Sequence, residues 1–239
     1  MRAEAPVMPR LTVIVPVLRD DAALDGLLAA LRRLDCPPER LIVADGARSG
    51  QTAALCRRHS ARWLPCACGR GPQLSAGVSG SRRPGAAAEV LWFLHADSRP
   101  DPRAARAIRL AIVRGAVGGY FRFRFDGPRS GMKFFLERSI ALRCRVGTVY
   151  GDQGIFVTRS VYEAGPGFAA QPLFEEVPLI RSLKRTGGFV ALDVPITVDP
   201  RRWERDGYLR RTLHNRVLAL GHLLGVPPLR LAQWYRATR

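Results

Sequence analysis

The 239-residue chain lacks the segments that mark membrane-spanning and secreted proteins. No uninterrupted apolar run reaches the ~18 residues that a transmembrane helix requires, and the opening MRAEAPVMPR holds no apolar stretch of the secretory type. The five cysteines form no C-x-x-C pair, which argues against a zinc site and against a disulfide framework. We therefore expect a cytoplasmic protein whose thiols are reduced.

Three familiar nucleotide-binding and hydrolase signatures are also absent. Gly69-Arg70-Gly71 begins a G-x-G pattern, but Leu74 stands where a dinucleotide-binding loop has its third glycine. The chain contains no G-x-x-x-x-G-K-[ST] phosphate loop and no G-x-S-x-G nucleophile turn. These absences argue against phosphate-loop nucleotide hydrolysis and against a serine hydrolase.

Lysine is nearly missing from a strongly basic chain. Only Lys133 and Lys184 are lysines among 38 basic residues, which outnumber 20 acidic ones and give a net charge of +18. The charge predicts an anionic partner without identifying it: a phosphate-rich small substrate, an anionic membrane surface or nucleic acid. The sequence has no nucleic-acid recognition motif, and a half-buried strand explains the alternating Phe and Arg of residues 121–125 more simply. We therefore expect no nucleic-acid partner.

Strand and helix patterns alternate over the first hundred residues. Short apolar runs rich in β-branched residues predict strands at residues 11–17, 40–45, 62–65 and 89–94. Apolar residues at helical spacing predict helices at about residues 21–34, 52–59 and 73–81. This alternation predicts an α/β fold built on a Rossmann-like, mostly parallel sheet with helices on both faces.

The second half of the chain has a mixed pattern. Strict alternation of Phe and Arg within residues 118–126 predicts a half-buried antiparallel strand. The pattern predicts further helices at residues 104–113, 132–143 and 175–185, and further strands at 154–158 and 189–194. The last segment reads as two helices separated by Pro227–Pro228. We expect a main domain over residues 1–206 and a C-terminal helical appendage over 207–239 within the same structural unit.

Polar residues that directly follow the predicted strands are the first candidates for a site, because open α/β sheets bind ligands outside the carboxyl ends of parallel strands. Asp45 ends the second strand, and it either bonds a ribose hydroxyl or a base N–H or closes a turn. Asp97 follows the apolar VLWFL run and suits a hard cation, Mg²⁺ or Mn²⁺, that bridges two phosphates. The alternative is that Asp97 caps a helix beginning at Ser98.

Two later clusters carry acidic residues. Gly151-Asp152-Gln153-Gly154 places a carboxylate and an amide in a glycine-bounded turn before an apolar strand. Glu175 and Glu176 open a predicted helix, where the helix dipole favours negative charge. One interpretation is that both glutamates stabilise the helix, and the other is that one of them acts as a general base. Neither cluster identifies a reaction by itself.

Taken together, these segments resemble a family 2 inverting glycosyltransferase of GT-A fold. The chain is most similar to the subgroup of radical-SAM/selenodomain-associated transferases, also described as arsenosugar-biosynthesis glycosyltransferases. The resemblance runs from Leu11 to Arg236, beginning with a strand that contains VIVP. It rests on six motifs in the family's order, found at residues 45–52, 69–73, 94–98, 151–156, 172–177 and 201–207.

The resemblance implies a nucleotide-sugar site with a divalent metal. Asp45 would contact the nucleotide base, Arg70 and Gln73 the donor, and Asp97 the Mn²⁺ or Mg²⁺ ion on the diphosphate. The motifs imply further donor-side contacts for Pro16, His95, Ala96, Gly151, Gln153, Arg202 and Trp203. The last two, an R-W pair, would close over the diphosphate or the acceptor.

The resemblance also implies which carboxylates are catalytic. Glu176 would deprotonate the acceptor as it attacks the anomeric carbon, and Asp152 and Glu175 would lie beside it. The chain departs from the family's pattern at three positions: His95 replaces the first acid of D-x-D, a replacement that the subgroup shares, Gly50 replaces an acid of the first motif, and Glu176 replaces an aspartate.

We therefore expect an inverting glycosyltransferase that moves a sugar from a nucleotide-sugar, a UDP-sugar, to an acceptor that the sequence does not identify. The alternative is a non-catalytic relative that binds a nucleotide-sugar or an anionic surface. The net charge and the acid missing at Gly50 favour this alternative, whereas the retained Asp97, Asp152 and Glu176 oppose it.

The last segment leaves a second question open. Residues 199–239 hold nine arginines and three acids, and one helical stripe there is apolar: Leu209, Leu213, Val217, Leu220, Leu223 and Leu224. This stripe either packs against the sheet or a second subunit, as in a homodimer, or lies on an anionic membrane surface. In the last case the cytoplasmic protein would be peripheral on the inner membrane face.

Overall fold

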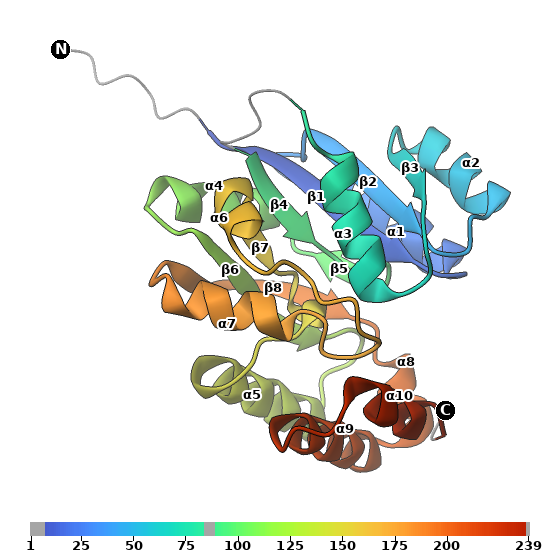
Figure 1. Cartoon of the computed structure of the whole chain (residues 1–239), viewed down its shortest axis with the longest axis vertical. Helices are drawn as coiled ribbons and strands as arrows, with labels where there is room; N and C mark the ends of the chain where they lie inside the picture. The colour runs from blue at the N-terminus through green and yellow to red at the C-terminus, as the bar shows by residue number, and fades with distance from the viewer. Residues whose placement is uncertain (1–7, 84–88, 238–239) are drawn as a thin grey trace.

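An eight-stranded sheet organises the structure in the strand order β3-β2-β1-β4-β7-β6-β8-β5 (Figure 1). The structure is a computed structural model that describes residues 8–83 and 89–237, apart from the side chains of residues 202, 236 and 237. The strands are β1 (Arg10–Val17), β2 (Arg40–Asp45), β3 (Arg62–Pro65), β4 (Glu89–Phe93), β5 (Ser98–Pro100), β6 (Gly118–Phe125), β7 (Phe156–Thr158) and β8 (Phe189–Val198).

Helices connect these strands and follow them. They are α1 (Asp21–Arg32), α2 (Gly50–Arg58), α3 (Arg70–Gly80), α4 (Ala104–Val113), α5 (Gly131–Val146), α6 (Arg159–Ala164), α7 (Val177–Arg185), α8 (Arg201–Asp206), α9 (Tyr208–Leu223) and α10 (Pro228–Ala237). A short 3₁₀ helix, η2, spans Gly151–Gln153.

The first half of the chain forms the parallel part of the sheet. β1 lies between β2 and β4, and β2 pairs with β3, all in parallel. The apolar runs of β1 and β4 are buried almost throughout, because helices cover both faces of a parallel sheet. The α/β fold with a mostly parallel sheet is therefore confirmed.

Helices pack on both faces of the sheet and enclose two apolar cores. The first core holds side chains of α1, α2 and α4, including Leu28 and Ile108. The second holds side chains of α3, α6 and α7, including Val78 and Leu179. The leucines of α1 point to the sheet because they recur at helical spacing, which places them on one side of the helix.

The second half of the sheet differs in one respect from the sequence prediction. On β6 the phenylalanines are buried and Arg122 and Arg124 are exposed, as the alternation predicts. The expected antiparallel pairing is correct for β7 but wrong for β8, which runs parallel to β6. Alternation reports that one face of a strand is buried and carries no information about the direction of its partners.

A buried ion pair lies at the amino end of β4, opposite the carboxyl ends of the parallel strands. Arg159 Nε donates a 2.8 Å hydrogen bond to Glu89 Oε2, and both side chains are almost fully buried. Arg159 also bonds Ser81 Oγ, and Thr12 Oγ1 donates to the other oxygen of Glu89. This network joins β1, β4 and α6.

The two C-terminal helices lie beside α5 at one end of the molecule (Figure 1). Arg216 Nη2 donates a 2.6 Å hydrogen bond to Ser139 Oγ, which ties α9 to α5. Leu231 of α10 is buried against α9, where a Cβ on Gly221 would lie only 2.9 Å from it. The two predicted helices are confirmed, while the domain division at residue 206 stays a prediction.

The apolar stripe of α9 does not pack against the sheet. Its side chains are exposed by half to three quarters of their surface, from 50% at Val217 to 75% at Leu224, just past the helix end. The interpretation that the sheet covers the stripe is therefore wrong. Within residues 8–83 and 89–237, no helix is both long enough and apolar enough to cross a membrane.

Candidate active site

Asp45, at the end of β2, is fully buried and holds the turn that follows it. Its Oδ1 accepts a hydrogen bond from the Ala47 amide at 2.8 Å. Its Oδ2 accepts bonds from the Ser49 amide at 2.7 Å and from Trp63 Nε1 at 3.1 Å. The structure gives Asp45 the turn-closing role, and its contact with a nucleotide base stays a prediction.

Gln73 ties together the ends of β1 and β2. Its Nε2 donates hydrogen bonds of 2.8 Å to the carbonyl oxygens of Val17 and Ala44, and its side chain is buried. Pro16 pairs with Ala44 across the same two strands. Gln73 and Pro16 therefore shape the strand ends where a ligand would bind, and a direct donor contact by either stays a prediction.

The chain turns sharply between β4 and β5. The Ser98 amide donates a 3.0 Å hydrogen bond to the carbonyl oxygen of His95, so Ala96 and Asp97 occupy the turn. Asp97 does not cap a helix at Ser98, because residues 98–100 form β5 and pair with β8. His95 and Asp97 are half-buried at the carboxyl end of the parallel strands, the position expected for a site.

The turn at Gly151 lies against His95. A Cβ on Gly151 would stand 2.8 Å from His95 Nε2, so a larger residue would displace the imidazole. The same turn continues as η2 and ends at Gly154, whose positive φ of 60° favours glycine. Asp152 is therefore held next to the β4–β5 turn, as the glycine-bounded pattern predicts.

Gln153 is buried behind this turn and supports it. Its Oε1 accepts hydrogen bonds from the Tyr150 amide at 3.3 Å and from Cys144 Sγ at 3.2 Å. Its Nε2 is buried and has no hydrogen-bond partner in the part of the chain that the structure describes. Contact of Gln153 with a donor stays a prediction.

Glu176 reaches the same place from a distant part of the sequence. Its Oε1 accepts a 3.1 Å hydrogen bond from the Gly151 amide, and its Oε2 is buried with no such partner among the described residues. The helix α7 begins at Val177 with Glu176 as its N-cap, close to the predicted start at about Glu175. Phe174, directly before the two glutamates, has a left-handed φ of 60°.

Glu175 is buried beside Arg70 and forms an ion pair with its guanidinium. The Arg70 side chain keeps 39% of its surface exposed, so it is the accessible member of the pair. Gly71 allows this close packing, because a Cβ there would clash with the carbonyl oxygen of Ala169. Glu175 therefore holds a cation in place at the N-terminus of α3.

The electrostatics single out Glu176. Burial raises its pKa to about 7, the charge of Glu175 adds to the rise, and Arg70 opposes it. Burial also opposes the charge of Arg70, but the two glutamates outweigh this effect and raise the pKa of Arg70. Burial raises the pKa of Asp152; Arg143 and Arg70 lower it, and Asp97 raises it further. The site thus holds a carboxyl whose pKa lies near neutral pH, and it is surrounded by side chains of both charges.

Arg143 and Tyr150 belong to this site although the sequence did not indicate them. The Arg143 guanidinium lies 4.3 Å from the centroid of the Tyr150 ring, and its charge acts on Asp152. Tyr150 also packs on Phe174, with ring centroids 5.7 Å apart. Nothing distinguishes Arg143 from the many other arginines in sequence, whereas Tyr150 directly precedes the Gly151 motif and is detectable from that position.

Trp203 packs on the sheet. Its ring centroid lies 5.1 Å from that of Phe125 and 6.4 Å from that of Phe123, both on β6. Closure of Trp203 over a diphosphate or an acceptor therefore stays a prediction. The side chain of Arg202, for which the same role is predicted, lies outside the described residues.

The donor set fits a metal ion that shares its coordination with a substrate. Among the described residues, no three His, Cys, Asp or Glu side chains are grouped to hold a metal ion. Asp97 is close enough to Asp152 to raise its pKa, and Asp152 Oδ1 is buried without a hydrogen-bond partner in the same described part. One or two carboxylates suffice where substrate phosphates complete the coordination of Mg²⁺.

The architecture is the GT-A fold, the fold of several solved glycosyltransferases. Glucosyl-3-phosphoglycerate synthase from Mycobacterium tuberculosis, solved with Mn²⁺, UDP and glucosyl-3-phosphoglycerate, superposes with a TM-score of 0.60 at 17% identity over 92% of this chain and 81% of that one.

Two further neighbours carry different donors. The mannosyltransferase PcManGT from Pyrobaculum calidifontis, in complex with GDP-mannose and Mn²⁺, has a TM-score of 0.59 at 17% identity over 80% of this chain and 57% of that one. TarS residues 1–349 from S. aureus, in complex with UDP-GlcNAc, has a TM-score of 0.60 at 14% identity over 80% and 58%. No protein-family model and no curated protein matches the chain. At these identities the likeness establishes the fold.

Proposed function

We propose that this chain is an inverting glycosyltransferase that transfers a sugar from a UDP-sugar to an acceptor, with Glu176 as the general base. The observation that carries the proposal is the placement of Glu176: a buried carboxyl with a pKa of about 7, bonded to the Gly151 amide. A base with a pKa near the working pH combines adequate basicity with a large ionised fraction. Its position at the strand ends of a GT-A fold supports this role.

The donor side is supplied by Asp97 and Arg70. When bound, a Mn²⁺ or Mg²⁺ ion held by Asp97 and by diphosphate oxygens neutralises charge on the leaving nucleoside diphosphate. Arg70 adds a partly exposed cation whose position is fixed by Glu175. Asp152, beside Asp97, keeps a buried oxygen without a hydrogen-bond partner among the described residues, which suits a contact with the sugar or the acceptor.

The choice of a UDP-sugar and of the subgroup rests on the motifs. UDP or UDP-GlcNAc is present in two of the neighbours, whereas the third holds GDP-mannose. The turn after Asp45 and the strand ends at Pro16 would accept the base, and Gln73 would hold the backbone of that pocket. The His95-x-Asp97 pair supports the radical-SAM/selenodomain-associated, arsenosugar-type subgroup.

One observation favours the alternative of a non-catalytic, nucleotide-sugar-binding relative. Gly50 starts α2, and a Cβ there would meet nothing within 4 Å among the described residues. Packing therefore does not require the loss of the acid that the family carries at this position. The buried cluster of Glu176, Glu175 and Arg70 at the strand ends supports the enzyme instead, because it sets a carboxyl in position to accept a proton.

The exposed stripe of α9 supports a place on a membrane surface. Residues 207–239 contain six arginines and no acid, so the helices that carry the stripe are cationic. We infer that the protein is cytoplasmic and peripheral on the anionic inner face of a membrane, with a homodimer as the alternative cover for the stripe.

Calorimetry with UDP tests the enzyme proposal. UDP should bind the full chain in the presence of Mn²⁺, and EDTA should weaken that binding by about tenfold or more. Transfer from a UDP-sugar, followed by NMR, should give a product of anomeric configuration opposite to that of the donor. A UDP affinity that EDTA leaves unchanged contradicts the metal-assisted mechanism, and retained configuration contradicts inversion.

A further inference from the structure

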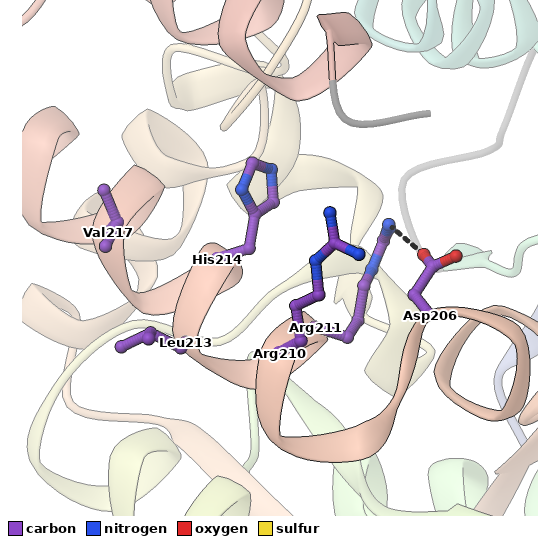
Figure 2. A pocket seen from close by; sticks show the side chains of 6 residues that line it. All are labelled: Asp206, Arg210, Arg211, Leu213, His214 and Val217. Atoms are coloured by element: carbon purple, nitrogen blue, oxygen red, sulfur yellow. Dashed lines mark hydrogen bonds and ion pairs between the residues drawn. The ribbon is translucent and has the colours of Figure 1, made fainter.

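A pocket of about 300 Å³ opens along the first half of α9 (Figure 2). Its lining consists of Asp206, Arg210, Arg211, Leu213, His214 and Val217. Figure 2 shows Arg210 and His214 extending to the same side of the helix, with Arg211 beside them reaching Asp206. None of these six residues is among the site residues that the sequence motifs indicate.

Arg211 is the fixed cation of this pocket. Only 6% of its surface is exposed. Its Nη1 donates to Asp206 at 3.1 Å and its Nη2 donates to the Tyr235 hydroxyl at 2.7 Å. Its Nε is buried and has no hydrogen-bond partner within the described chain. A buried donor of a charged group is costly to leave unpaired, so an acceptor oxygen supplied by a ligand would stabilise it.

The charge in the pocket favours an anion. Asp206, the acid in the lining, is already paired with Arg211 and with Arg205, whose Nε lies 2.7 Å away. Arg210 is exposed, and no described acidic side chain pairs with it. Burial and the charges of Arg211 and Arg210 lower the pKa of His214, and Asp206 opposes this effect. The pocket therefore offers a cation that lacks a counter-ion.

One electrostatic effect and one ring contact relate α9 and α10 to the candidate catalytic residues. Tyr235, which holds Arg211, also helps to raise the pKa of Arg70, after the larger effects of burial and of the two neighbouring glutamates. Farther along α9, His222 stacks on Phe174 with ring centroids 4.5 Å apart. Phe174 directly precedes the two glutamates. The helix that lines the pocket therefore also reaches, at His222, the segment that carries the proposed base.

The remaining lining is apolar. Leu213 is 65% exposed and Val217 is 50% exposed, and both lie on the stripe of α9 described above. An anionic group that binds the arginines would therefore have an apolar surface immediately beside it. A ligand that carries an anionic group next to an apolar portion matches both parts of the pocket.

We propose that the α9 pocket binds an anionic group of the acceptor, a phosphate or a carboxylate, through Arg210 and Arg211. The assignment of the anion to the acceptor rests on the proposed function, whereas the binding of an anion does not. The anion could belong to a soluble acceptor or to a lipid headgroup, because both present the same oxygens to the arginines.

The test uses inorganic phosphate and octyl phosphate, titrated by calorimetry into the full chain without UDP. Loss of one charge-assisted contact in Arg210→Gln should weaken binding by about tenfold or more. Arg230→Gln, on exposed α10 and outside the pocket, is the matched control and should change the affinity less than about twofold. Octyl phosphate should bind more tightly than inorganic phosphate, because its chain covers Leu213 and Val217. Equal affinities of the two variants for both probes would overturn the proposal.

A second titration separates this proposal from the proposed function. UDP with Mn²⁺ should bind Arg210→Gln as tightly as the unmodified chain. If Arg210→Gln weakens UDP and phosphate equally, the pocket belongs to the donor and the acceptor assignment is wrong. If UDP binds no variant while phosphate binding still depends on Arg210, the anion site stands and the glycosyltransferase proposal fails.

Vesicles identify the source of the anion. Phosphatidylcholine vesicles with and without phosphatidic acid are sedimented with the full chain and with Arg210→Gln. Recovery that requires both phosphatidic acid and Arg210 assigns a lipid headgroup. Tight, Arg210-dependent binding of octyl phosphate without vesicle recovery assigns a soluble acceptor. No dependence on Arg210 in either assay overturns the site.

Discussion

The Gly151 amide donates a hydrogen bond of 3.1 Å to Glu176 Oε1 across 25 positions of sequence. The contact joins the glycine-bounded turn that lies against His95 to the segment that precedes α7. It fixes one oxygen of the carboxyl and leaves the other without a hydrogen-bond partner among the described residues. A carboxylate anchored in this way keeps an oxygen that can receive a proton while its orientation is maintained.

Replacement of Glu176 by glutamine should lower kcat by ~10²–10⁴-fold, because the amide preserves shape but cannot accept the proton. UDP binding should be retained, which calorimetry on the same sample checks. Glu175→Gln and Asp152→Asn are the matched variants, and each should reduce kcat less. An active Glu176→Gln variant, combined with greater damage from either neighbour, would assign the base elsewhere.

The pH dependence should carry the signature of Glu176. The base must be ionised to act, so kcat/KM should rise with pH up to a pKa of about 7 and level off above it. Glu175→Gln should shift the rising part of the pH profile to lower pH. The substitution removes a negative charge that raises the pKa of Glu176, and it leaves Arg70, which lowers that pKa, without its partner. Initial rates from pH 5 to 9 measure both. A rising part that stays in place in the Glu175→Gln variant contradicts the coupling.

Removal of the metal ligand should affect binding and turnover together. Asp97→Ala should abolish transfer and lower the affinity for UDP in Mn²⁺ by about tenfold or more, because it removes the carboxylate proposed to hold the ion. Without metal, the variant and the unmodified chain should bind UDP alike. A variant that still gains affinity from Mn²⁺ would show that the ion is held by other residues.

Loss of the buried pair of Arg159 and Glu89 should lower the free energy of unfolding more than loss of an exposed ion pair. Glu89→Gln leaves buried Arg159 with only the partly exposed Glu163 as counter-ion and should lower the free energy of unfolding by ~3 kcal/mol. Glu163 pairs with Arg159 at 3.4 Å but keeps 37% of its side chain exposed, so Glu163→Gln should cost less than about 1 kcal/mol. Urea unfolding measures both, and equal losses would contradict the ranking.

The α9 stripe should respond to lipid composition. Full chain mixed with phosphatidylglycerol-containing vesicles should sediment with them at low salt and remain in solution with phosphatidylcholine alone. Replacing exposed Leu220 and Leu224 by glutamine should reduce recovery, whereas Val113→Gln on α4, 41% exposed in the unmodified chain, should not. If both lipids leave the protein in solution, light scattering should instead show a dimer that the Leu220 and Leu224 changes dissociate.

Local patterns specified most of the fold. The apolar run of β2 gives its bounds directly, because a strand covered on both faces admits few polar residues. β5 escaped prediction because three residues are too few to show a period. The parallel pairing of β6 with β8 escaped because side-chain alternation is the same for either direction.

The candidate site was predictable where its residues lie in glycine-bounded or strand-end motifs. Asp97 and Asp152 lie in such motifs, whereas Glu176 is assigned by the family resemblance, and the structure brings Gly151 and Glu176 into contact. Tyr235 and Arg211 were not found, because their placement depends on how α9 and α10 pack and no local sequence signal reports it. Gln73 shows the converse: the motif indicated a ligand contact, and the structure shows an amide that joins two strands.

The short connection between β4 and β5 sets the shape of the whole sheet. β4 and β5 are four places apart in the strand order, a distance of ~19 Å across a flat sheet at ~4.8 Å per strand. The five steps from Phe93 to Ser98 reach at most ~18 Å when fully extended, and the turn at His95 shortens them further. The connection is too short to join β4 to β5 across a flat sheet, so the sheet must curve. Asp97 therefore lies in a short connection that can form only because the sheet is curved.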